Sequence, residues 1–176
     1  MNVMVRLLIP TDGSGLAERA MAAMGPWTRQ WGAEVVLMRV ISPGEARDTV
    51  AEYTRRVPDS ETRQQAMRGL PVEPARALAE DRGQALERIR TEIEDSLREL
   101  ARTHLVGVST QIHAIWSDNV ADAIVAAAND FGASFIAMAS HGRSGLGQAI
   151  LGSVASEVVR HSPVPVIVIN EHVVAS

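Results

Sequence analysis

The sequence contains no cysteine and few aromatic residues, and both shortages narrow the classes of function. Without cysteine the chain can form no disulfide, no catalytic thiolate and no Cys-based zinc site. Aromatic residues make up only 3% of the chain, too few for the stacking surfaces that bind single-stranded nucleic acid. Any nucleotide would therefore have to be held mainly by backbone amides.

The chain also lacks a basic stripe and a long apolar run. Its 17 Lys and Arg residues are outnumbered by 21 Asp and Glu, which gives a net charge of −4. Nucleic acid and anionic membranes are therefore not expected partners. No apolar stretch approaches the roughly 20 residues of a membrane span, and no cleavable leader is evident at the start. We expect a soluble, cytoplasmic protein.

The length and composition fit one folded domain. The 176 residues are 46% hydrophobic and 22% charged, which is enough apolar content for a single sizeable core. We expect one domain over residues 1–176, with a polar, partly helical insert at about 43–83. In that region charged residues and prolines are frequent, and no apolar period is sustained.

Five short apolar runs are typical of strands buried on both faces of a parallel sheet; they span residues 3–10, 34–41, 106–116, 134–139 and 164–169. Helical spacing returns between most of these runs, most strongly over 85–100, and Gly25-Pro26 predicts a kink or a break in the first helix. The alternation predicts an α/β fold, a doubly wound five-stranded parallel sheet with helices on both faces. Pro165 places the last strand at a sheet edge, because proline lacks an N–H for a ladder.

Ligands of such sheets bind beyond the carboxyl ends of the strands, where the strand order reverses. Here those ends are Pro10-Thr11-Asp12 and Ala139-Ser140-His141-Gly142. Generic nucleotide fingerprints fail at both. Gln148-Ala149 stands where a P-loop requires Lys and Ser or Thr, and Glu18 stands where a dinucleotide fingerprint requires a small residue.

A longer arrangement remains, in which the glycine-rich stretch 142–147 leads into a helix that begins near Gly152-Ser153. Glycines let the backbone approach phosphate oxygens closely, and the start of a helix presents unpaired amides and the positive end of a dipole. Such a loop binds anions without a lysine. The residues therefore indicate a phosphate-binding site opposite Asp12.

Three motifs resemble those of the universal stress protein family. Pro10-Thr11-Asp12-Gly13-Ser14 follows the first strand, and Ser162-Pro163-Val164-Pro165 opens the last one. Between them, residues 139–153 follow the family's nucleotide-binding pattern: Gly, two residues, Gly, nine residues, then Gly with Ser or Thr. Ala139 replaces the first glycine of that pattern. The resemblance covers the chain except for residues 42–82, and it implies that the five strands lie in the order 3-2-1-4-5.

This resemblance implies that the protein binds an adenine nucleotide, ATP with Mg²⁺ on its phosphates, in a regulatory or stress-response role. It places Gly142, Arg143 and the start of the last helix around the phosphates and ribose. The full set of nucleotide-binding residues that it implies is Pro10, Thr11, Asp12, Val40, Met138, Ala139, Ser140, His141, Gly142, Arg143, Gly145, Gly152, Ser153 and Val154. It also implies a homodimer formed through the edge strand Val164–Ile169, because an exposed edge needs covering.

Two other readings stay open. The Ala139 methyl group would intrude if that backbone must contact the ribose or adopt a positive φ, and the protein would then be a dimeric interaction module without nucleotide. An enzyme acting on a nucleotide-activated substrate is supported only by analogy of fold. His141 has no partner histidine or Ser-His-Asp arrangement in the sequence, so we predict no catalytic residue, at most slow ATP hydrolysis, and no metal site formed by side chains.

Overall fold

The computed structural model of the protein describes residues 4–45, 74–140 and 151–170. The chain divides into two compact units, one formed by Met1–Ser42 with Ile93–Ser176 and the other by Pro43–Glu92. The boundary after Glu92 lies inside a helix. The sheet and the described part of the predicted site belong to the first unit.

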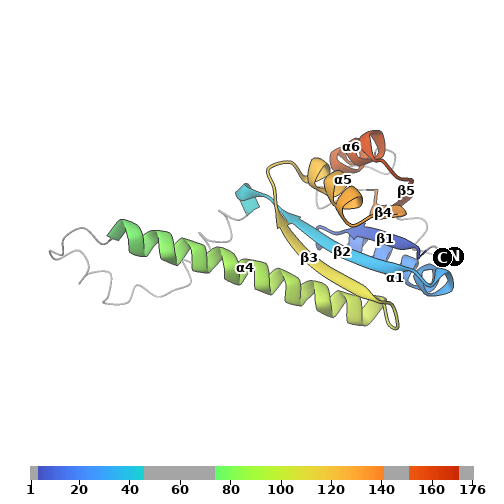
Figure 1. Ribbon diagram of the computed structural model, residues 1–176, viewed down its shortest axis with the longest axis horizontal. Coiled ribbons are helices and arrows are strands. Elements are labelled where there is room, and N and C mark those ends of the chain that lie inside the picture. The colour runs from blue at the N-terminus through green and yellow to red at the C-terminus, as the bar shows by residue number, and fades with distance from the viewer. Residues whose placement is uncertain (1–3, 46–73, 141–150, 171–176) are drawn as a thin grey trace. The chain divides into compact units, whose positions relative to one another are not determined.

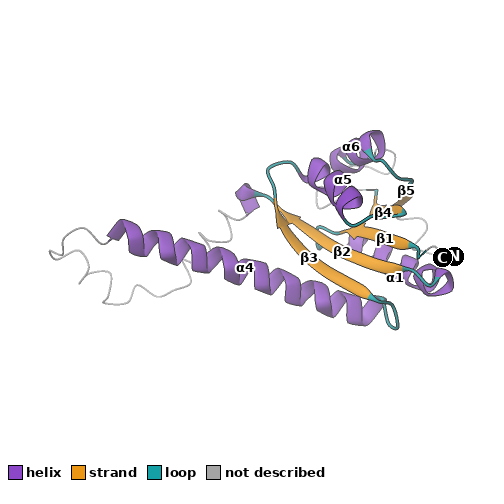
Figure 2. Cartoon of the chain, viewed as in Figure 1, coloured by secondary structure: helices purple, strands orange, loops and turns teal. Residues whose placement is uncertain are grey.

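Five parallel strands form one sheet in the order β3-β2-β1-β4-β5 (Figure 1). The strands are β1 (Arg6–Pro10), β2 (Glu34–Ile41), β3 (Thr110–Trp116), β4 (Phe135–Ala139) and β5 (Val166–Ile169). Each strand is connected to the next strand in the sequence through a helix (Figure 2). The predicted fold class and strand order are confirmed.

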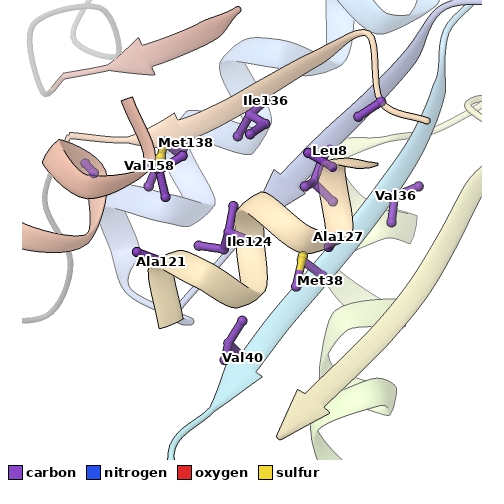
Figure 3. Packing of buried hydrophobic residues seen from close by; sticks show 13 residues of the cluster. Leu8, Val36, Met38, Val40, Ala121, Ile124, Ala127, Ile136, Met138 and Val158 are labelled. Atoms are coloured by element: carbon purple, nitrogen blue, oxygen red, sulfur yellow. The ribbon is translucent and has the colours of Figure 1, made fainter. Parts of the chain in front are cut away.

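Helices cover both faces of the sheet, because successive side chains of a strand point to opposite sides. On one face, a core cluster joins β1, β2 and β4 to α5 (Val120–Asp130) and α6 (Ser153–His161) (Figure 3). On the other face, a second cluster joins the strands to α1 (Gly15–Trp31) and to the end of α4 (Pro74–His104). Leu8 and Val36 belong to the first cluster, and their neighbours Leu7 and Val35 belong to the second.

Helix α1 begins and ends as its sequence predicts. The side chain of Ser14 caps its first turn by accepting a hydrogen bond from the Ala17 N–H, and Gly32 ends it with a φ of 58°. The helix is continuous through Pro26, so the break that we considered at Gly25-Pro26 does not occur. Packing against the sheet outweighs the backbone hydrogen bond that proline removes.

Three elements differ in extent from the sequence expectation. Helix α4 starts at Pro74, earlier than the apolar stripe from Ala85 indicates, and proline is favoured in the first turn of a helix. Strand β3 starts at Thr110, after a turn in which Gly107 adopts a φ of 77°. Strand β5 starts at Val166, so Pro165 precedes the strand, and the predicted edge position is confirmed.

Within the residues that the structure describes, no helix is long and apolar enough to cross a membrane.

Candidate functional site

The first strand and the fourth strand separate toward their carboxyl ends. Parallel pairing between β1 and β4 is confined to Leu7 with Phe135 and Leu8 with Ile136. In contrast, β1 stays paired with β2 as far as Pro10, and β4 stays paired with β5 as far as Ala139. Both strands therefore continue past the point where they stop pairing with each other. This is the position at which the strand order reverses, where doubly wound sheets hold their ligands.

The turn after β1 is tightly organised by its own polar groups. The backbone N–H of Thr11 donates to the carbonyl oxygen of Met38 at 2.9 Å, which extends the pairing with β2 by one residue. The N–H of Gly13 donates to Thr11 Oγ1 at 3.1 Å, and the N–H of Ser14 donates to Asp12 Oδ1 at 2.9 Å. Asp12 thus shapes the turn with one oxygen, which fixes its carboxylate just beyond the carboxyl end of β1.

Gly13 is a residue of this turn that the predicted site did not include. Its φ is 76°, a conformation in which glycine pays no steric cost. The Asp-Gly pair is itself a turn signal, so the role of Gly13 in this turn could have been predicted from the sequence. Gly13 positions Asp12 and Ser14 and need not contact a ligand.

The end of β4 and the start of α6 are joined by a hydrogen bond. The N–H of Gly152 donates to the carbonyl oxygen of Ser140 at 2.8 Å, and the Ser140 N–H donates to the carbonyl oxygen of Ile169 in β5. Ser140 is almost fully buried. The two ends of the glycine-rich loop therefore lie side by side at the carboxyl edge of the sheet.

The first turn of α6 has no side-chain cap. Its N-cap residue is Gly152, which cannot supply an acceptor, and no side chain takes that role. The amides of Ser153 and Val154 have no partner inside the helix, since the first N–H groups of any helix lack one. Ser153 is exposed and Val154 is half-buried. An uncapped helix start that reaches solvent favours an anion.

The remaining described members of the predicted set are mainly core residues of the same region. Pro10, Val40 and Met138 are buried near the ends of β1, β2 and β4. Figure 3 shows Met138 beside Val158 of α6 and Val40 near the carboxyl end of β2. Their side chains are buried, so only their backbone groups are available to a ligand.

Ala139 is the last residue of β4 and has an extended backbone. It is paired in register with Ile169, and its methyl group packs against the core cluster on the α1 face. Alanine adopts this conformation without strain. The backbone here therefore does not require glycine, which was one of the two reasons to question this position.

His141, Gly142, Arg143 and Gly145 lie outside the described residues. Among the residues that are described, no group of three or more His, Asp or Glu side chains is arranged to hold a metal ion. The described part of the site therefore consists of the Thr11–Ser14 turn, the Ser140–Gly152 junction and the open first turn of α6.

Comparisons with known proteins agree with this architecture. A sequence model of the universal stress protein family matches residues 4–170. Universal stress protein MJ0577 of Methanocaldococcus jannaschii is 29% identical over 179 residues, which cover 97% of this chain and 98% of that protein.

Solved structures share the fold. The structure of MJ0577 has a TM-score of 0.68 at 24% identity and covers 96% of this chain and 98% of its own. UspA from Lactobacillus plantarum has a TM-score of 0.63 at 19% identity, with 94% and 97% covered. A universal stress protein in complex with cAMP has a TM-score of 0.58 at 15% identity, with 96% and 98% covered. The family match over nearly the whole sequence, together with this fold, shows that the chain belongs to the universal stress protein family.

Proposed function

We propose that the protein binds an adenine nucleotide, ATP with Mg²⁺ on its phosphates, in the gap between β1 and β4, and that binding serves a regulatory role in the stress response. The observation that carries this proposal is the uncapped start of α6, held beside the end of β4 by the Ser140–Gly152 hydrogen bond. Amides at a helix start bind phosphate through hydrogen bonds and the helix dipole.

The opposite side of the gap suits the nucleoside. Thr11 and Asp12 follow β1 directly, and a carboxylate fixed at such a strand end can accept hydrogen bonds from ribose hydroxyls. The family relative solved with cAMP holds an adenine nucleotide on the same fold. Phosphates at α6 and the nucleoside at the β1 turn give one orientation for the whole ligand. No residue in this arrangement is assigned a catalytic role.

Titration of the nucleotide-free protein tests the proposal directly. We expect saturable binding of ATP in the presence of Mg²⁺, measured by calorimetry, and weaker binding of AMP because it offers fewer phosphate oxygens to α6. GTP serves as a control for recognition of the base. Absence of saturable ATP binding at millimolar concentration would overturn the proposal.

Substitution of Ala139 by glycine tests whether the methyl group obstructs the ligand. Because this methyl packs on the core, we expect the ATP affinity to stay within about threefold of the wild type, a difference below the roughly 1.4 kcal/mol of a tenfold change. We also expect a stability loss of about 0.5–1 kcal/mol, since glycine weakens strands. A tenfold gain in affinity would instead identify Ala139 as the residue that limits binding.

We also propose a homodimer formed through β5, on a separate observation. Backbone carbonyls of Pro165 and Ile169 accept hydrogen bonds from Ile136 and Ser140 on the β4 side. Because backbone groups alternate in direction along a strand, the N–H and C=O groups of Val166 and Val168 point away from β4, to the edge of the sheet. The strand is wholly apolar, and such an edge is a template for pairing with another chain.

A further inference from the structure

Half of the six aromatic residues of the chain form one continuous surface at the side of α1. The rings of Trp27 and Trp31 lie with centroids 5.9 Å apart, and the ring of Trp31 lies 6.2 Å from that of Phe135. The two tryptophans remain 51% and 39% exposed. Indole rings bury large apolar areas when they are covered, so this aromatic shelf, defined as Trp27, Trp31 and Phe135, is a candidate contact surface.

The shelf lies on the flank of α1 that is turned away from α4. Gly25 of α1 faces the carbonyl oxygen of His104 at the end of α4. Trp27 follows Gly25 by two residues, which is about 200° around a helix. Phe135 is the first residue of β4, and the outer neighbour of β4 is β5. The shelf therefore faces the β5 side of the sheet.

Apolar surface continues from the shelf to the sheet edge. Ile167 of β5 packs against the same core cluster as Phe135 and is half-buried. The next position outward is the edge of the sheet, where Val166 and Val168 present their backbone groups. The shelf and the edge strand are thus parts of one apolar surface on the α1 face.

We infer that this shelf is covered by a second copy of the chain, as the flank of the dimer interface that we propose at β5, and the inference rests on that dimer. Antiparallel pairing of two β5 strands would relate the copies by a twofold axis perpendicular to the sheet. Both shelves then lie on the same face, one on each side of the seam. The strand of one copy extends toward the shelf of the other.

The short length of β5 supports a second copy of the chain as the partner that covers the shelf. Only four residues form the strand, and strand pairing of that length buries far less than the roughly 1,200–2,000 Å² of a stable interface. A tryptophan buries up to about 250 Å² in full, so the exposed parts of Trp27 and Trp31, 51% and 39%, add roughly 100 Å² each, and the shelves of two copies add roughly 400 Å² to the interface. Tryptophan is also the residue type most enriched among side chains that dominate binding energy.

Sedimentation of four proteins tests the inference: the wild type, Trp27→Ser with Trp31→Ser, Val168→Pro, and the control Val106→Ser. Val168→Pro removes an outward N–H without disturbing the β4 ladder. Val106 is 62% exposed and lies after α4, so its replacement removes exposed apolar surface elsewhere. We expect a wild-type dimer, at least about tenfold weaker association in the Trp and Pro variants, and no change in the control.

The outcomes separate the two proposals. A wild-type protein that is monomeric at tens of micromolar overturns both the dimer and the covered shelf. Dissociation by Val168→Pro with the Trp variant within about threefold of the wild type keeps the edge dimer and overturns the shelf. Dissociation by the Trp variant alone keeps the shelf as a contact between copies and overturns pairing through β5.

Tryptophan fluorescence provides a second measurement, in which the shelf residues are not mutated. Trp116 lies on β3, at the other edge of the sheet, and the chain has three tryptophans. In Trp116→Phe, all tryptophan emission therefore comes from the shelf. We expect the emission maximum to move to longer wavelength on dilution, with the same midpoint as dissociation in sedimentation. Emission that is independent of concentration across that midpoint would contradict the inference.

Discussion

Replacing Ser153 with proline is expected to weaken ATP binding by roughly 10-fold to 100-fold, because it removes one amide hydrogen bond to a charged ligand, which contributes about 1.5–3 kcal/mol. The stability of the protein should not change. Ser153 is the first residue of α6, and proline is favoured at that position because the N–H there has no partner in the helix.

The backbone at this junction is already suited to proline. Gly152 has φ −58° and ψ 155°, which is the extended conformation that a residue before proline adopts. The substitution therefore isolates one amide of the proposed phosphate site without a new backbone geometry. Few positions in a binding loop allow the removal of a single backbone donor.

Ser153→Ala is the matched control. It removes the hydroxyl group and keeps the amide, so the difference in ATP affinity between the alanine and proline variants measures the amide alone. Calorimetry gives the affinities, and thermal unfolding without nucleotide shows that both variants fold. If the proline variant is stably folded and binds ATP as tightly as the alanine variant, the start of α6 does not hold the phosphates.

The sheet could be predicted from the sequence because its strands are buried on both faces. Runs such as Glu34–Ile41 are almost wholly apolar, and only a covered parallel strand tolerates that composition. The alternation of strand and helix indicated a parallel sheet but left its strand order open, and the order came from the resemblance to the family. The ends of strands were less predictable, since Val106–Ser109 is apolar enough for a strand but contains the turn at Gly107.

Helix α1 shows why a local signal can fail. Gly25-Pro26 reads as a helix breaker in isolation, yet the residues around it are held by tertiary contacts. Met21 and Met24 are buried and pack in one core cluster with Leu7 of β1 and Leu37 of β2. Contacts between elements distant in sequence decided the outcome, and a single sequence does not reveal such contacts.

The candidate site was predictable in its composition and not in its contacts. The turn residues and the helix start were evident from Asp12-Gly13-Ser14 and Gly152-Ser153. The hydrogen bond between Ser140 and Gly152, and the orientation of the Ala139 methyl toward the core, depend on how β4 meets α6 and α1. These features decide whether an alanine in place of the first glycine of the family pattern matters.

Gly25→Ala is expected to destabilise the protein by about 1–3 kcal/mol, although alanine is the better helix former by about 1 kcal/mol. A Cβ atom at Gly25 would overlap the backbone carbonyl oxygen of His104. That oxygen cannot move alone, because Leu105 is buried next to it and its N–H donates to the carbonyl oxygen of Ala101 at 2.9 Å. α1 and the end of α4 would have to separate.

The control for the contact between Gly25 and His104 is Gly83→Ala, which is the same substitution inside α4. A Cβ atom at Gly83 meets nothing within 4 Å in the described part of the chain. The higher helix propensity of alanine then acts without a steric clash, and we expect the free energy of unfolding to rise by about 0.5–1 kcal/mol. Thermal and urea unfolding measure both variants. If Gly25→Ala lowers the free energy of unfolding and Gly83→Ala raises it, the destabilisation comes from the contact between α1 and the end of α4. A Gly25→Ala protein as stable as Gly83→Ala would mean that the two helices can separate without loss, and that close approach at Gly25 does not stabilise this face of the sheet.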